Sequence, residues 1–167
     1  MVYFNRTENN AIIFQGLSVA PWGQYGNSNV TIQAKGIESI IELKPISEVN
    51  FAIGYTYTDK DAEADYLPKN KITAQIDYKP SENLFVSLAY KNVGERTGRY
   101  YDATTFTTVE KQLPTYQLLD INANYRLLNG KVIFFGSLTN LFNEDYEETI
   151  GYTTRGRNYK FGIRLQF

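Results

Sequence analysis

The chain has 167 residues, and its 17 Lys plus Arg are balanced by 18 Asp plus Glu, which leaves a formal net charge of −1. This balance gives no electrostatic basis for binding nucleic acid or for a polybasic membrane anchor. The sequence contains neither Cys nor His, so disulfides, thiolate zinc sites and His-dependent catalysis are excluded. No apolar run approaches the ~18 residues that a membrane-spanning helix needs.

Apolar and polar side chains alternate along most of the chain, and a period of two indicates β-strands whose two faces differ. The pattern is clearest near the end, where Tyr159, Phe161 and Ile163 alternate with Lys160 and Gly162. We expect about eight strands and no helix. In chain order the expected strands span residues 2–13, 36–44, 49–58, 71–78, 84–93, 119–127, 131–139 and 159–167, of which 2–13 has the weakest pattern.

Short and long connections alternate between these strands. Segments 45–48, 79–83 and 129–130 are rich in Pro, Asn and Gly, which is typical of tight turns. Between them lie the long polar segments 15–29, 59–68, 95–115 and 143–155. This order places every tight turn at one end of an up-and-down antiparallel sheet and every long loop at the other. Outer-membrane β-barrels have the same asymmetry.

The aromatic residues indicate what surrounds the apolar face. The chain has 14 Tyr and 10 Phe, and Tyr recurs near strand ends, as in the aromatic girdles of a membrane barrel. On the polar face, Asp120, Arg126, Lys160 and Arg164 are expected to line a wet lumen. There they could pair across strands, as a small closed barrel would require, or face a plug in a larger one. These features favour an all-β transmembrane barrel. The alternative is a soluble β-barrel or sandwich, whose apolar face points inward.

Several motifs resemble those of TonB-dependent outer-membrane receptors, and the resemblance extends over essentially the whole chain. They are Gly36-Ile37-Glu38, Leu67-Pro68-Lys69-Asn70-Lys71, Asn140-Leu141-Phe142 followed by Tyr146, and Gly151-Tyr152 followed by Gly156-Arg157-x-Tyr159. In addition, Lys160, Gly162, Leu165 and Phe167 look like the C-terminal signal that the barrel-assembly machinery reads.

The resemblance implies a barrel of about 22 strands around an N-terminal plug, preceded by an energy-coupling box. Residues 1–167 are then expected to be the C-terminal barrel segment, with the plug absent. The implied partners are the other strands and plug of the same receptor, the TonB complex acting through that plug, the barrel-assembly machinery, and the lipid and lipopolysaccharide of the bacterial outer membrane. No export signal follows Met1, so we expect the natural N-terminus to lie upstream.

Two functions remain open. The first is TonB-dependent uptake of a scarce nutrient complex, cobalamin-like or siderophore, and the run around Gly151-Tyr152 looks closest to that of cobalamin receptors. The second is a self-contained barrel of about eight strands with a structural or adhesive role, whose first strand must pair with its last. We expect no enzyme and no catalytic residue, because no acid–base constellation is present.

Candidate ligand-contacting residues lie in the long loops, since cationic and aromatic side chains can hold an anionic or ring-rich ligand. The same side chains could instead contact lipopolysaccharide or pack against neighbouring loops. These candidates are Trp22, Arg96, Arg99, Tyr100, Tyr101 and Tyr152.

Four alternating carboxylates form a second candidate site. Asp59, Asp61, Glu63 and Asp65 could offer oxygen ligands to Ca²⁺, and the resemblance to cobalamin receptors also implies loop calcium. However, the run lacks the Gly turn and the terminal bidentate Glu of a dedicated calcium loop. An exposed acidic loop is the favoured interpretation, and no cofactor is expected.

Overall fold

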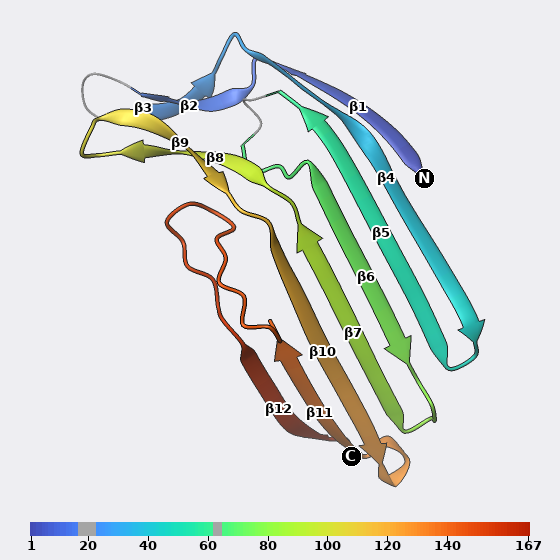
Figure 1. Cartoon of the computed structure of the whole chain (residues 1–167). Coiled ribbons are helices and arrows are strands. Elements are labelled where there is room, and N and C mark those ends of the chain that lie inside the picture. The colour runs from blue at the N-terminus through green and yellow to red at the C-terminus, as the bar shows by residue number, and fades with distance from the viewer. Residues whose placement is uncertain (17–22, 62–64) are drawn as a thin grey trace.

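The computed structural model describes residues 1–16, 23–61 and 65–167, and it is built almost entirely from antiparallel strands. Eight strands form one sheet in the order β1-β4-β5-β6-β7-β10-β11-β12 (Figure 1). This confirms the all-β antiparallel prediction. The strands of this sheet are β1 (Val2–Asn9), β4 (Thr31–Ile46), β5 (Val49–Lys60), β6 (Asn70–Tyr78), β7 (Leu84–Val93), β10 (Tyr116–Leu127), β11 (Val132–Thr139) and β12 (Asn158–Leu165).

Two of the predicted long loops contain further strands. Segment 15–29 overlaps the hairpin of β2 (Ile12–Gly16) and β3 (Gly23–Asn27), and segment 95–115 contains the hairpin of β8 (Arg96–Asp102) and β9 (Thr107–Leu113). The prediction of irregular loops was wrong there. Each hairpin pairs only with itself in the part of the chain that the structure describes. It therefore extends beyond the main sheet and does not need one continuous apolar face.

The tight turns lie at one end of the sheet and the long connections, which include the two hairpins, at the other (Figure 1). The separation of short and long connections was predicted. The β4–β5 connection is tighter than expected, because β4 continues through Ile46 with a register shift between Leu43 and Ile46. This irregularity contains Pro45, which cannot donate a ladder hydrogen bond. The β10–β11 turn is the short 3-10 element η1 (Leu128–Gly130), whose residues all have positive φ angles of 52° to 88°.

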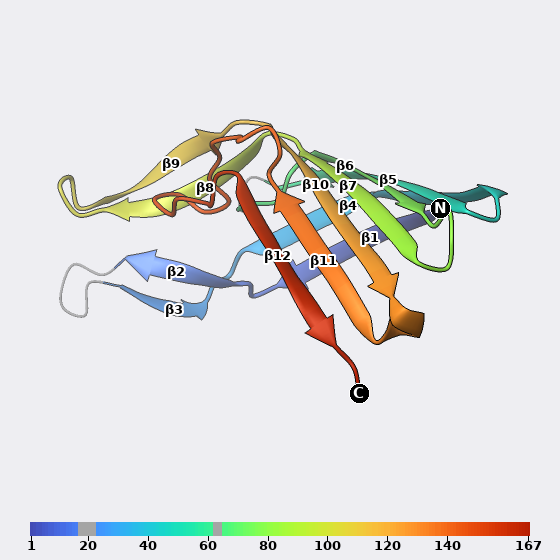
Figure 2. The same cartoon turned by 90° about the horizontal axis from the view of Figure 1, so that it is seen from below.

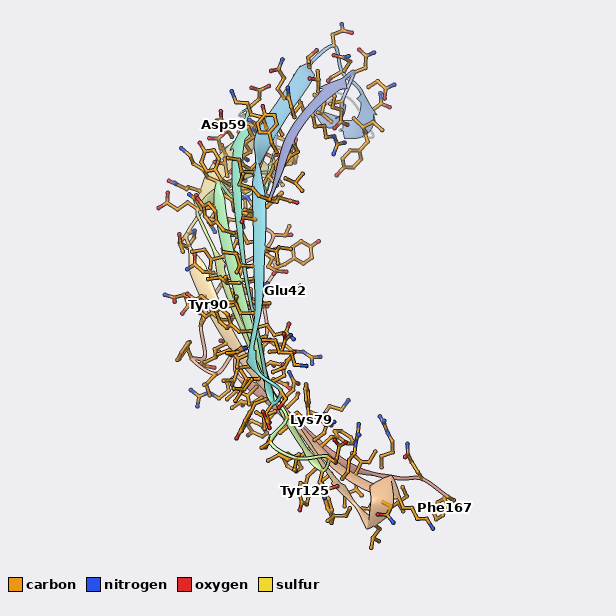
Figure 3. All side chains as sticks on the ribbon, turned by 90° about the vertical axis from the view of Figure 1, so that its right-hand side faces the viewer. Glu42, Asp59, Lys79, Tyr90, Tyr125 and Phe167 are labelled. Carbon is orange, nitrogen blue, oxygen red and sulfur yellow. The ribbon has the colours of Figure 1, made fainter. Side chains whose placement is uncertain are left out.

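The pairing registers place apolar and polar side chains on opposite faces of this single layer. Tyr90 and Glu42 project to opposite sides of it in the edge-on view (Figure 3). The apolar face includes Ile37, Ile41, Leu43, Phe51, Ile53, Tyr55, Ile72, Ile76, Leu88, Tyr90, Ile121, Tyr125, Phe134, Leu138, Phe161 and Ile163. The polar face includes Glu38, Glu42, Thr56, Lys71, Gln75, Lys91, Asp120, Arg126, Lys160 and Arg164.

The sheet is curved, with the polar face on its hollow side (Figure 2). None of the described segments forms a second layer over the apolar face, and many of its side chains are exposed, with Phe161 at 80%. Each large aliphatic or aromatic side chain left in water forgoes about 1.5–3 kcal/mol of transfer free energy. The face therefore needs an apolar solvent. A sandwich would cover this face and a soluble barrel would turn it inward, so the structure fits neither alternative.

The sheet remains open. Among the described residues, β1 pairs only with β4 and β12 only with β11. The pairing of the first strand with the last, which a self-contained small barrel requires, does not occur. None of the described residues forms a helix long and apolar enough to cross a membrane.

Two glycines in different strands of the sheet, Gly36 in β4 and Gly136 in β11, provide a comparative test of strand packing. A methyl group at Gly36 would collide with the backbone oxygen of Tyr57 and lie 2.7 Å from the ring of Phe4. At Gly136 the nearest heavy atom, a Lys160 oxygen, lies 3.9 Å away. We expect Gly36→Ala to lower the free energy of unfolding by about 1–3 kcal/mol. Gly136→Ala should leave it unchanged or raise it by up to about 1 kcal/mol.

Urea unfolding of the folded receptor in lipid bilayers measures both variants. Equal stabilities for Gly36→Ala and Gly136→Ala would contradict the close approach of β4 to β5 and to the ring of Phe4.

Candidate binding site at the loop end of the sheet

A cavity of about 720 Å³ lies on the polar face at the loop end of the sheet. Basic side chains outnumber acidic ones around it, and three aromatic rings contribute to its wall. Such a surface suits an anionic or ring-containing group. The charged and aromatic residues that line it are Arg6, Lys71, Lys91, Arg96, Glu38, Glu148, Phe4, Tyr66 and Tyr116.

Arg96, the first residue of β8, is buried at one side of this cavity, with 5% of its surface exposed. Its guanidinium donates to the carbonyl oxygen of Pro114, at 3.2 Å, and to that of Glu147. It also lies 4.9 Å from the ring centroid of Tyr116. A buried cation is tolerated only when polar groups compensate for lost hydration, and here two carbonyl dipoles and a ring face do so.

Tyr116 is the centre of an aromatic and charged cluster. Its ring stacks on Tyr146 with centroids 4.4 Å apart, and its hydroxyl donates to Glu148 Oε1 at 3.0 Å. The ammonium of Lys91 lies 5.4 Å from the Tyr116 centroid and 3.4 Å from the same carboxylate. The cluster joins β7 and β10 to loop 140–157, which connects β11 with β12.

The Glu148 carboxylate makes this attachment sensitive to pH. The hydrogen bond from Tyr116 and the ammonium of Lys91 lower the pKa of Glu148 below its ordinary value of 4.5. Because the pKa of Glu148 is lower in the docked loop, its ionised carboxylate stabilises docking at any pH above the ordinary pKa. This stabilisation is lost as the pH falls through the lowered pKa of the docked state. We expect a spectroscopic label at Tyr152→Cys to become more mobile when the pH falls below the ordinary Glu148 pKa of 4.5. Glu148→Gln should remove that transition, and its persistence would contradict the assignment to Glu148.

Two asparagines hold the base of loop 140–157. Asn140 is buried and has a left-handed φ of 52°, and its amide donates to the carbonyls of Glu144 and Arg155. The Asn140 oxygen accepts from the backbone of Glu144, and the backbone of Asn140 donates to Asp120. At the other end, Asn143 accepts from the backbone of Arg157 at 2.8 Å. The base of the loop is therefore closed by side-chain hydrogen bonds.

Tyr66, in the connection between β5 and β6, packs against β8. The backbone of Tyr66 donates to Thr97, and its hydroxyl donates to the carbonyl of Arg99. A methyl group at Gly98 would lie 2.5 Å from the Tyr66 ring and 3.0 Å from Ile150 of loop 140–157. Three segments far apart in sequence therefore meet at Gly98.

The family model for the TonB-dependent receptor-like β-barrel matches residues 2–141. The chain belongs to this family. Its membership confirms the resemblance drawn from the sequence motifs and identifies the chain as part of an outer-membrane barrel. In such barrels the apolar band faces lipid, the short turns are periplasmic and the longer loops are extracellular.

Solved receptors share the fold. The pyoverdine outer-membrane receptor FpvA of Pseudomonas aeruginosa, bound to pyoverdine, is 21% identical with a TM-score of 0.76 over 99% of this chain and 26% of that one. The siderophore receptor PirA of Acinetobacter baumannii is 14% identical, with a TM-score of 0.74 over 99% and 29%. The iron transporter FrpB of Neisseria meningitidis is 17% identical, with a TM-score of 0.72 over 96% and 28%. The chain thus spans about a quarter of their length.

The structure separates the predicted ligand-contacting residues of this receptor chain into three groups. Tyr100, Tyr101 and Tyr152 are exposed on the loops, with Tyr152 at 72%. Arg96 lines the cavity but is buried, and Arg99 lies 3.6 Å from Asp65 and 3.5 Å from Glu110. Trp22 lies outside the described residues. Ligand contact by these residues stays a prediction.

The predicted calcium ligands do not converge. Asp59 pairs with Lys35 at 3.4 Å, Asp61 accepts from the backbone of Gln33 at 2.7 Å, and Asp65 faces Arg99. Glu63 lies outside the described residues. Within residues 1–16, 23–61 and 65–167, no three or more carboxylates lie close enough together to hold a metal ion. Each of the three described carboxylates thus has its own partner, and calcium binding by this loop stays a prediction.

The predicted assembly signal lies on and just beyond β12. Lys160 and Gly162 are on the polar face, where the ammonium lies 6.0 Å from the ring centroid of Phe135. That ring covers Gly162, since a methyl group there would lie 2.5 Å from its Cζ atom. Leu165 and Phe167 are exposed. Recognition of these residues by the assembly machinery stays a prediction.

The cross-strand pairs that the four lumen charges could form do not occur among the described residues. Asp120 accepts from the backbone of Asn140 instead of pairing with a cation. Among the described residues, the ion pairs include none of Arg126, Lys160 and Arg164. The roles of Tyr116 and Glu148 were also not predicted from the sequence. These two residues are 32 positions apart in the chain, and no local pattern links them.

Proposed function

We propose that this chain supplies the C-terminal barrel strands and extracellular loops of a receptor for TonB-dependent uptake of a siderophore complex. The cavity with its excess of basic side chains and its aromatic wall carries the proposal, because ferric siderophores offer anionic and ring-containing groups. The siderophore receptors among the similar structures support it. A cobalamin-like complex is the second candidate ligand, favoured by the run around Gly151-Tyr152.

The rest of the receptor completes the structure in this proposal. Additional strands pair with the free edges of β1 and β12, because an open edge in lipid leaves backbone groups without hydrogen bonds. A plug from the same receptor occupies the polar side, and the TonB complex acts through it. The barrel-assembly machinery reads the β12 signal, and the loops contact lipopolysaccharide. A small self-contained barrel is not favoured, since β1 and β12 do not meet.

Uptake by the complete receptor tests the proposal. A strain lacking its own receptors is given the full gene, and accumulation of labelled ferric siderophores and of labelled cobalamin is measured with and without TonB. We expect TonB-dependent accumulation of a ferric siderophore. Accumulation of cobalamin alone would move the assignment to the second ligand, and accumulation of neither would overturn the proposed uptake.

Basic residues of the cavity should contribute to ligand affinity. We expect the double variant Arg6→Gln and Lys71→Gln to weaken siderophore binding about fivefold, since two partly exposed charges at about 0.5 kcal/mol each add to about 1 kcal/mol. Lys79→Gln, in a tight turn at the other end of the sheet (Figure 3), serves as the control for loss of one charge. Equal affinities for all variants would argue against the cavity as the binding site.

A further inference from the structure

We propose that Arg96 is a positioning residue that couples loop 140–157 to the β8–β9 hairpin, so that these two extracellular segments behave as one rigid unit. This inference concerns the free receptor and does not depend on the ligand that is transported. It follows from the contacts of Arg96, from a second set of contacts made by the loop, and from the way the loop base is held.

The guanidinium of Arg96 connects two segments that are distant in sequence. It donates to Pro114, just after the hairpin, and to Glu147, which is 51 residues further along the chain than Arg96. A guanidinium is planar and carries five N–H donors, so it can hold several acceptors in a fixed geometry. Undocking the loop would remove the Glu147 carbonyl from a cation that is almost fully buried, which is costly.

The loop presents its own groups to the same place. Tyr146 places its ring on Tyr116, and the hydroxyl of Thr154 donates to the Tyr146 carbonyl at 2.6 Å, which crosslinks the loop behind that ring. A third link, the Lys111–Glu147 ion pair at 2.9 Å, is partly exposed and is expected to contribute little. The polar attachment above the loop base therefore consists mainly of the Arg96 and Tyr116 contacts, beside the apolar approach of Ile150 to Gly98.

The loop base is held separately by Asn140 and Asn143. Losing the Arg96 attachment should consequently release the outer part of the loop and leave the barrel strands intact. With the attachment present, the exposed Tyr101 of the hairpin and Tyr152 of the loop keep a constant separation. A ligand or partner that contacts both residues would meet a preorganised surface, so its binding would not include the entropic cost of ordering these segments.

Distance measurements between two spin labels test this coupling. The 167 residues contain no Cys, so Tyr101→Cys and Tyr152→Cys are introduced into the complete receptor, freed of any reactive cysteine elsewhere and reconstituted in lipid bilayers without ligand. Arg96→Met removes the donors but keeps an unbranched side chain. Lys111→Met removes the exposed ion pair to the same loop and is the matched control. Heat-modifiable gel migration shows that each barrel is folded.

We expect one narrow distance distribution in the parent and in Lys111→Met. In Arg96→Met the detached population should rise roughly tenfold, because one buried hydrogen bond to a charged group is lost. Tyr146→Ala, which leaves every barrel strand unchanged, should broaden the distribution in the same direction and stands in if Arg96→Met does not fold. An unchanged distribution in folded Arg96→Met would overturn the proposal, as would equal broadening in Lys111→Met. If Arg96→Met does not fold, an unchanged distribution in Tyr146→Ala overturns it.

Discussion

Ile53→Arg should lower the free energy of unfolding of the receptor in lipid by about 2–4 kcal/mol, the cost of a cation near the bilayer midplane. Ile53 lies on the apolar face of β5, between Ile41 of β4 and Ala74 of β6. An arginine there must extend its side chain toward the interface or draw water into the hydrocarbon. Urea titration of the receptor in bilayers measures the loss.

Gln75→Arg is the matched control for Ile53→Arg. Gln75 lies on the polar face of β6, and its amide donates to Asp77 at 3.0 Å. A new cation at this position stays hydrated and close to that carboxylate, so we expect a change within about 0.5 kcal/mol. If the two arginines cost the same, the assignment of the two faces would be wrong.

Asn140→Ala should open loop 140–157 at its base and destabilise the docked loop by about 4 kcal/mol. The substitution removes three side-chain hydrogen bonds, each contributing about 0.5–1.5 kcal/mol. It also places alanine at a left-handed φ of 52°, which adds about 1 kcal/mol. Amide hydrogen exchange across residues 144–157 measures the opening.

Two further substitutions separate these contributions. Asn140→Gly loses the same hydrogen bonds but tolerates a positive φ, so it should cost about 1 kcal/mol less than Asn140→Ala. Asn140→Asp keeps the acceptor for the backbone of Glu144 and loses both donations, so we expect an intermediate exchange rate. Identical exchange in all three variants and the parent would show that other contacts hold the loop base.

The strands of the main sheet could be predicted from the sequence, since lipid on one side and water on the other impose a strict period of two. The predicted span 84–93 equals β7, Leu84–Val93. The β8–β9 hairpin escaped prediction because it extends beyond that sheet, where no single apolar face is required. Likewise, nothing near Arg96 in the sequence shows that it is buried. Its compensating partners, Tyr116 and the carbonyl of Glu147, are brought to it only by the fold.

The two phenylalanine rings that cover glycines, Phe4 over Gly36 and Phe135 over Gly162, lie in the first and last strand pairs of the sheet. A slip of one residue turns every apolar side chain into the lumen and is rejected by lipid. A slip of two residues preserves both faces, so the binary pattern cannot detect it. It would, however, place Phe135 opposite Lys160 or Arg164 instead of a glycine. Each ring therefore favours a single pairing register, in β1–β4 at one edge of the sheet and in β11–β12 at the other.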